Sequence, residues 1–251
     1  MYNKIVGVDP KKVVFKSFGG KSYSDNPKAI SEKLHEMCPE AKITWIFKTP
    51  QAKKSLVPSY VRVVKSTFLR EAKELATAGV WVDNFGKPYW LYKSKNQRYI
   101  QTWHGDRGFK KILYDAWPER KRPTPLIEEK MCDLAIAGSS FGERLYRTAF
   151  NYKGLVLTSG SPRNDILVIN NKRESLLIKK TLGIDSNTRV LLYAPTFRSR
   201  ERNGCQKLPK IDFSNVIHVL EGRTSQRWLL LIRSHSSVKG LEKPKDKYLE
   251  F

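Results

Sequence analysis

Residues 133–158 read DLAIAGSSFGERLYRTAFNYKGLVLT and contain one complete strand–helix–strand pattern. The apolar run 133–137 predicts a buried strand. Ser140 and Glu143 then have the spacing of a capping box, so we expect a helix to begin there. A second apolar run, 155–158, predicts the next strand. Alternation of this kind is typical of α/β domains with parallel sheets.

The same alternation extends over the rest of the chain. We expect strands at 13–15, 43–47, 61–64, 79–82, 98–103, 189–194 and 228–233, and helices at 67–78 and 213–220. Most of the strands are apolar throughout, which favours sheets that are covered on both faces. We place a domain boundary before the strand at 155–158, so the sequence predicts an α/β fold with two domains, 1–152 and 153–251.

The composition indicates a folded protein with an anionic partner. Of the 251 residues, 40% are hydrophobic, which excludes wholesale disorder. The chain has 47 Lys and Arg residues against 24 Asp and Glu residues, a net charge of +23. Such a charge favours nucleic acid, an anionic membrane surface or a phosphate-rich substrate. The basic residues are dispersed and form no recognised nucleic-acid motif, so we expect no nucleic-acid partner.

Cysteine usage and hydropathy predict a cytoplasmic protein. Cys38, Cys132 and Cys205 are far apart and form no CxxC pair, which is typical of reduced thiols. The N-terminus lacks the apolar segment of a secretory signal peptide. The longest strongly apolar run, 228–232, is far shorter than the roughly 20 residues that span a bilayer.

Four segments that follow expected strands are rich in His, Arg, Ser and Thr. They are 101–106 (QTWHGD), 159–165 (SGSPRND), 192–198 (LYAPTFR) and 231–237 (LIRSHSS). In open α/β sheets, ligands bind outside the carboxyl ends of the strands. Together the four segments therefore indicate one shared cleft that handles phosphate.

His104 and Gly105 are the candidates in the first of these segments. A histidine at a strand end can take a proton from a hydroxyl group near neutral pH. The adjacent glycine lets a substrate approach the backbone closely. The alternative is a structural histidine that caps the next helix, and the residues alone leave both interpretations open.

The second and third segments contain candidate phosphate ligands. Arg163 can bind a phosphate, whereas Asn164 and Asp165 fit a plain turn and helix N-cap equally well. Thr196 can donate a hydrogen bond to an oxygen, and Arg198 can pair with a phosphate. A solvated basic loop is the alternative for these last two residues.

Several well-known catalytic motifs are absent from the sequence. It contains no GxxxxGK[ST], GxSxG, HExxH or Asp-x-Asp motif, and its four histidines are too scattered for a zinc site. We therefore expect no metal ion or cofactor, with Arg, Lys and His side chains offsetting phosphate charge.

Five segments, taken in order and spacing, resemble one known family. They are 15–30 (FKSFGGKSYSDNPKAI), 101–105 (QTWHG), 160–165 (GSPRND), 193–198 (YAPTFR) and 233–235 (RSH). The family is that of the CDP-glycerol glycerophosphotransferases of teichoic acid and capsule synthesis, with their CDP-ribitol relatives. The resemblance covers nearly the whole chain.

The resemblance implies a glycosyltransferase-B-like fold, in which two Rossmann-like domains face each other across a cleft. By this likeness, residues 1–152 form the acceptor-side domain and 153–251 the domain that binds the CDP-linked donor. The family continues beyond the position of Phe251 with a Thr-Asp-Tyr-Ser-Ser-like segment and closing helices. We therefore expect the second domain to be incomplete.

The resemblance also implies a reaction. A hydroxyl group of a lipid-linked polymer acceptor attacks the β-phosphorus of CDP-glycerol or CDP-ribitol, and CMP leaves. By the match, His104 is the general base, and His235, with Arg233, stabilises the pyrophosphate. The residues that the match assigns to the donor and its phosphates are Gly105, Arg163, Asn164, Asp165, Thr196, Arg198 and Arg233.

The implied acceptor gives the positive charge a role. A lipid-linked acceptor lies at the inner face of an anionic membrane, so we expect a peripheral protein on that face. The alternative is a catalytically incomplete remnant, or a basic module that binds an anionic polymer or membrane surface.

Overall fold

The computed structural model describes residues 7–88, 91–105, 111–116, 127–169, 172–195, 211–233 and 248–250. The chain divides into two compact units, Met1–Asn170 and Asn171–Phe251.

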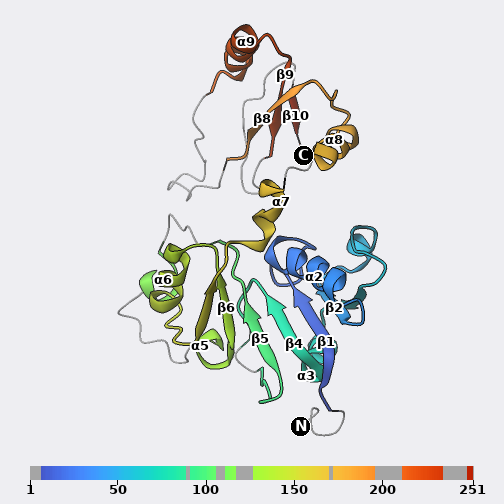
Figure 1. The fold of residues 1–251 in the computed structure, drawn as a ribbon, viewed down its shortest axis with the longest axis vertical. Helices are drawn as coiled ribbons and strands as arrows, with labels where there is room; N and C mark the ends of the chain where they lie inside the picture. The colour runs from blue at the N-terminus through green and yellow to red at the C-terminus, as the bar shows by residue number, and fades with distance from the viewer. Residues whose placement is uncertain are drawn as a thin grey trace, which may run out of the picture. The chain divides into compact units, whose positions relative to one another are not determined.

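The first unit is built on parallel strands with helices between them (Figure 1). Its strands are β1 (Asp9–Lys16), β2 (Lys42–Phe47), β3 (Arg62–Lys65), β4 (Ala78–Asp83), β5 (Arg98–Gln101), β6 (Leu134–Ala137) and β7 (Leu155–Thr158). Its helices are α2 (Asp25–Met37), α3 (Phe68–Thr77), α4 (Leu113–Ala116), α5 (Ile127–Met131), α6 (Ser140–Thr148) and α7 (Asp165–Val168), with short 3₁₀ turns η1 (Gln51–Leu56) and η2 (Pro162–Asn164).

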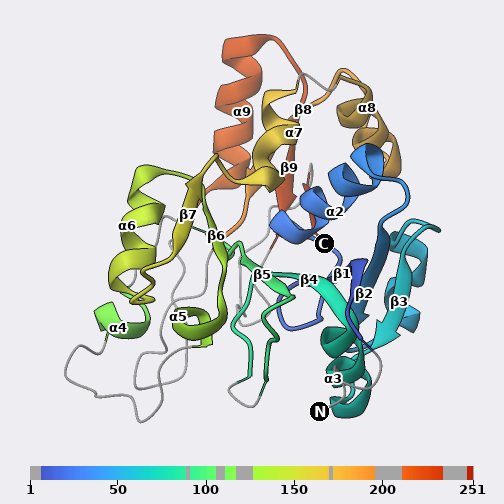
Figure 2. The ribbon, with the colours of Figure 1, turned by 60° about the horizontal axis from the view of Figure 1, so that its bottom comes forward.

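The seven strands form one sheet in the order β3-β2-β1-β4-β5-β6-β7, which Figure 2 shows from right to left. All neighbouring strands are parallel. The chain proceeds outward from β1 to β3, returns to β4 beside β1, and then proceeds in the other direction. Strand order therefore reverses between β1 and β4, and ligand crevices in such sheets form at the carboxyl ends of these strands.

Alternation along the strands explains why both faces of this sheet are covered. Successive residues of a strand face opposite sides. Phe15 of β1 packs in a cluster with Ile30 and Leu34 of α2. Its neighbour Val14 packs in a different cluster with Leu75 of α3. The expected α/β architecture, with parallel strands buried on both sides, is confirmed.

The second unit has a smaller parallel sheet. Its elements are α8 (Lys172–Thr181), β8 (Arg189–Tyr193), α9 (Phe213–Thr224), β9 (Trp228–Ile232) and β10 (Tyr248–Glu250), with strand order β10-β9-β8. Phe213 and Ile217 of α9 pack against Leu230 and Ile232 of β9. Among the residues described in either unit, no helix has both the length and the apolar character needed to cross a membrane.

The structure places the strand at 155–158 differently from our expectation. We expected this strand to open the second domain, but β7 pairs with β6 as the edge strand of the first sheet. The units consequently divide after Asn170 rather than after residue 152. An apolar run that follows a helix fits the edge of an existing sheet as well as the start of a new one, so the local pattern could not separate the two.

The cap of α6 also differs by one residue from the expected one. Ser139 has extended backbone with φ −164°, and its Oγ accepts a hydrogen bond from the Gly142 backbone N–H at 3.2 Å. Ser140 is the first residue of the helix. Glu143, expected to complete a capping box, instead accepts a hydrogen bond from the Thr158 hydroxyl at 3.1 Å and so ties α6 to β7.

A buried carboxylate connects three elements near the other edge of the sheet. Glu74 of α3 lies 2.6 Å from Lys12 of β1 and 2.7 Å from Arg62 of β3. Burial by itself raises the pKa of Glu74, but the hydrogen bonds and charges of Arg62 and Lys12 more than offset this and lower the pKa to about 2. The ionised form is therefore favoured in the folded state.

This lowered pKa predicts a specific loss of stability in acid. The contribution of Glu74 is fully present above its ordinary pKa of 4.5 and is lost as the pH falls through about 2. Urea unfolding between pH 5 and 2 should show that the free energy of unfolding falls less steeply in Glu74→Gln than in the wild type. Parallel curves for the two proteins would contradict this assignment.

Candidate active site

The candidate site lies where strand order reverses in the first sheet. Ser17 and Phe18 follow β1, Asn84 follows β4, and Trp103 and His104 follow β5. Because parallel strands end at the same edge of the sheet, these three loops meet there.

The imidazole of His104 is fixed by one hydrogen bond to a neighbouring loop. Its Nδ1 lies 2.8 Å from the backbone carbonyl oxygen of Asn84. A carbonyl oxygen can only accept, so Nδ1 carries the proton and donates it. In the neutral imidazole, Nε2 then has a free lone pair and can take a proton. This arrangement suits a general base, and it shows that Nδ1 bonds to a loop carbonyl rather than capping a helix.

Three aromatic rings surround this imidazole. The ring centroid of Trp103 lies 4.0 Å from that of His104, that of Phe18 lies at 5.5 Å, and that of Phe85 at 6.1 Å. They come from all three loops, so they restrict rotation of the imidazole about its side-chain bonds.

Asn84 joins the loops through its side chain as well as its backbone. The residue is fully buried. Its Oδ1 accepts a hydrogen bond from the Phe18 backbone N–H at 2.8 Å, and its Nδ2 donates to Ser17 Oγ at 3.3 Å. A single residue thus connects the β1 loop to the carbonyl oxygen that orients His104.

The side chain of Gln101, the last residue of β5, forms hydrogen bonds with the backbone of Trp103 and Phe85, whose rings lie beside the imidazole. Its Oε1 accepts a hydrogen bond from the Trp103 backbone N–H at 2.8 Å. Its Nε2 donates to the Phe85 carbonyl oxygen at 3.3 Å and to the Tyr99 hydroxyl at 2.7 Å. Since the side chain is completely buried, these bonds do not compete with water.

Buried charged groups lie beneath the loops. Lys87 and Asp83 form an ion pair at 2.6 Å, with each side chain only 2% exposed. Burial raises the pKa of Asp83, and the Lys87 ammonium opposes that rise. Glu128 accepts hydrogen bonds from Tyr99 and Gln101, and burial raises its pKa as well. Removing one member of such a pair typically costs about 3–5 kcal/mol, because the other charge is left buried without a partner.

Arg163 of η2 lies beside the His104 loop. Its Nη1 donates to Asp25 Oδ2 at 2.7 Å and to the His104 carbonyl oxygen at 2.8 Å. Its backbone N–H donates to Asn26 Oδ1 at 3.1 Å. A Cβ atom added at Gly105 would lie 3.8 Å from Arg163 Nη2. The structure therefore brings together three of the expected site residues, His104, Gly105 and Arg163.

The other expected residues have different positions. Asn164 and Asp165 are exposed, and Asn164 precedes α7 without a side-chain capping bond. Both belong to the first unit, although we assigned them to the donor-binding domain. Arg233 directly follows β9 in the second unit. The remaining expected residues lie outside the described part of the chain: Thr196, Arg198 and His235.

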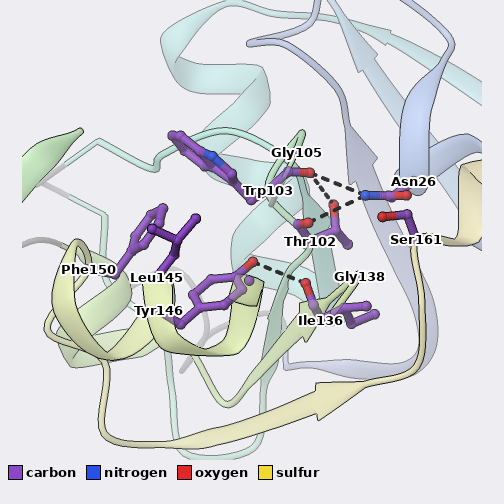
Figure 3. A pocket seen from close by; sticks show the side chains of 11 residues that line it. Asn26, Thr102, Trp103, Gly105, Ile136, Gly138, Leu145, Tyr146, Phe150 and Ser161 are labelled. Carbon is purple, nitrogen blue, oxygen red and sulfur yellow. Dashed lines mark hydrogen bonds between the residues drawn. The ribbon is translucent and has the colours of Figure 1, made fainter. Parts of the chain in front are cut away.

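A pocket borders the same loop (Figure 3). Trp103, Tyr146 and Phe150 lie on one side of it, and Asn26 and Ser161 on the other. This hollow is small and partly open to solvent, so the described residues do not enclose a ligand-sized cavity there.

Three residues of the site were not predicted from the sequence: Asp25, Asn26 and Asn84. Asn84 comes soon after the expected strand at 79–82, and an inspection of every strand end would have included it. Asp25 and Asn26 begin α2, a helix that we did not expect, and their proximity to residue 163 arises only in the folded chain.

The described ranges contain no group of three or more His, Cys, Asp or Glu side chains that could hold a metal ion. The expectation of a metal-free reaction stays a prediction.

Comparison with known proteins gives consistent matches. The family described as CDP-glycerol:poly(glycerophosphate) glycerophosphotransferase matches residues 1–250. A teichoic acid poly(glycerol phosphate) polymerase of Bacillus spizizenii is 32% identical over 250 residues, which cover 94% of this chain and 62% of that protein. A protein of the same name from Staphylococcus epidermidis is 34% identical over 242 residues, covering 91% of this chain and 33% of that one.

Solved structures of the wall teichoic acid polymerase TagF also match. One has a TM-score of 0.77 and 31% identity, covering 97% of this chain and 62% of that chain. A histidine variant of TagF soaked with CDPG has a TM-score of 0.75 and 31% identity, covering 92% of this chain and 58% of that one. The likeness confirms the expected α/β, glycosyltransferase-B-like fold class. This chain spans less than two thirds of the length of these relatives.

The bond between His104 and Asn84 predicts the tautomer of the imidazole. At a pH at which His104 is neutral, ¹⁵N NMR should show a protonated Nδ1 and an unprotonated Nε2, because the Asn84 carbonyl oxygen can only accept. The His104→Gln variant identifies the signal among those of the four histidines. A neutral Nε2–H tautomer would contradict the geometry.

Proposed function

Because the chain belongs to the CDP-glycerol:poly(glycerophosphate) glycerophosphotransferase family, we propose that it transfers glycerol phosphate from CDP-glycerol to a hydroxyl group of a teichoic acid or capsule polymer. The observation that supports this most directly is the geometry of His104. Its Nδ1 is used by the Asn84 carbonyl oxygen, so Nε2 is the nitrogen left to act on a substrate.

In the proposed reaction, His104 is the general base. The acceptor hydroxyl donates a hydrogen bond to Nε2 and loses its proton to that nitrogen as its oxygen attacks the β-phosphorus of the donor. The bond between this phosphorus and the oxygen that joins it to the α-phosphate breaks, and CMP leaves with the electron pair. A well-placed base of this kind typically contributes about 10²–10⁴-fold in rate.

We propose that residues of the second unit offset the negative charge that develops on the leaving group. Arg233, at the end of β9, carries a positive charge that can offset charge on the pyrophosphate. By the family resemblance, His235 takes part in the same task. Thr196 and Arg198 help to form the donor site. Preorganised donors of this type stabilise developing charge without a metal ion.

We further propose that the acceptor is lipid-linked and that the protein acts at the inner face of the cell membrane. The net charge of +23 supports attraction to an anionic surface. Each basic residue near such a surface contributes roughly 1 kcal/mol.

The reaction predicts a loss of CMP release when His104 is replaced. With CDP-glycerol and a lipid-linked primer, His104→Gln should lower the rate by about 10²–10⁴-fold, because the acceptor hydroxyl loses its base. His35→Gln is the matched control, since His35 stacks on Tyr60 and belongs to none of the three site loops. CDP-ribitol, offered in parallel, should be the poorer donor.

Two results would count against this proposal. Equal CMP release by His104→Gln and the wild type would remove His104 as the base. No CMP release by the wild-type chain would favour the alternative of a basic module that holds an anionic polymer or membrane surface.

The proposed membrane association has its own test. The protein should sediment with vesicles that contain phosphatidylglycerol at low salt and should be released at high salt, because the attraction is electrostatic. Vesicles of phosphatidylcholine alone are the control. Absence of binding to anionic vesicles at low salt would exclude this surface as a partner.

A further inference from the structure

We propose that Asp25, Asn26 and Arg163 form a clamp that positions the His104 loop, and that Arg163 is therefore a positioning residue rather than a ligand of the donor phosphates. This inference rests on the proposed function, in which His104 is the general base. It changes the role that the family resemblance implies for Arg163.

The guanidinium of Arg163 already has a charged partner. Its Nη1 lies 2.7 Å from Asp25 Oδ2, and the Asp25 side chain is only 5% exposed, whereas that of Arg163 is 33% exposed. The same nitrogen donates to the His104 carbonyl oxygen at 2.8 Å. A phosphate that approached this arginine would also meet the Asp25 carboxylate, so the attraction between the arginine and a phosphate is weakened.

Asn26 provides the second half of the clamp. Its Oδ1 accepts from the Arg163 backbone N–H at 3.1 Å. Its Nδ2 lies 3.4 Å from the carbonyl oxygens of both Thr102 and Trp103. Together with Arg163, it contacts three successive carbonyl oxygens of the loop, those of residues 102, 103 and 104. These contacts hold the backbone at residues 102–104, and Figure 3 shows Asn26 facing the loop.

Left-handed backbone in the clamp and in the loop that it holds supports the assignment. Asp25 has φ +66° and Trp103 has φ +47°, left-handed conformations that residues other than glycine seldom adopt. The Asp25 carboxylate is also oriented locally, since its Oδ1 accepts from the Asn26 backbone N–H at 2.6 Å. Strained residues persist when surrounding contacts hold them, and they concentrate at functional sites.

The clamp and the Asn84 contact hold His104 from two directions. Arg163 binds the carbonyl oxygen of His104, and Asn84 binds the imidazole through Nδ1. The position of Nε2 relative to a substrate depends on both contacts. A displacement of about 1 Å at a reacting group can lower a rate about 100-fold. Loss of the clamp should therefore act on kcat and leave donor binding nearly unchanged.

Kinetics of three variants test this role. We expect Asp25→Asn, Arg163→Gln and the double variant each to lower kcat for CMP release by about 10- to 100-fold, with the donor KM within about twofold of the wild type. The double variant should be no worse than the more affected single variant, because both residues act in one clamp.

An ion pair elsewhere in the same unit provides the control. Arg62 of β3 pairs with the buried Glu74, as Arg163 pairs with the buried Asp25. Arg62→Gln should lower the thermal stability but leave kcat unchanged. Circular dichroism and thermal unfolding establish that all variants are folded.

The imidazole NMR signal provides a readout that needs no activity. In the wild type, the Nδ1 proton of His104 should exchange slowly with water because it is bonded to the Asn84 carbonyl oxygen. In Asp25→Asn and Arg163→Gln, the exchange should be at least about tenfold faster, since the displaced loop weakens that bond. Arg62→Gln should leave the exchange rate unchanged.

The outcomes separate this inference from the proposed function. If the wild-type chain releases no CMP, the proposed function fails, and the NMR measurement alone decides on the clamp. An unchanged Nδ1 proton in both variants overturns the clamp. A second pattern would also overturn the clamp: Arg163→Gln raises the donor KM tenfold or more with kcat unchanged, while Asp25→Asn has wild-type kinetics. That pattern would identify Arg163 as a phosphate ligand.

Discussion

The hydrogen bond between His104 Nδ1 and the Asn84 carbonyl oxygen is the contact on which the candidate site depends. It determines which imidazole nitrogen carries the proton and which one can accept one. The bond exists only because β4 and β5 are adjacent parallel strands that end at the same edge of the sheet. The chemistry proposed for this chain is therefore a consequence of strand order as much as of the histidine itself.

The surroundings of this contact are polar and buried, which is unusual for the interior of a domain. Asn84 and Gln101 are fully buried and bonded on both ends of their side-chain amides. Asp83 and Lys87 form a buried pair next to them. Apolar residues would pack here at lower cost, but they could not fix the backbone of three loops. The buried polar residues therefore lower the stability of the fold but fix the geometry around His104.

Arg163 illustrates how the same side chain can be assigned two different roles. Its place in a Gly-x-Pro-Arg-Asn-Asp segment suggests a phosphate ligand, since guanidinium groups match phosphate geometry. Its contacts with Asp25 and with the His104 carbonyl oxygen suggest a part of the support. The pairing with Asp25 favours the supporting role, because an arginine that is paired with a buried carboxylate attracts a further anion less strongly.

The sequence by itself determined the α/β class and the parallel strands covered on both faces, and it placed His104 among the candidate residues after a strand, while its role as the base came from the family resemblance. The class, the covered strands and this placement follow from local patterns: apolar runs, helical spacing, and polar residues directly after a strand. Only the tertiary structure decided that β7 completes the first sheet, and that Asn84, Asp25 and Arg163 hold the His104 loop. Asp25 and Arg163 are 138 positions apart in the chain. The physical reason is that a contact between such distant residues depends on how whole elements pack, which the spacing of neighbouring residues does not specify.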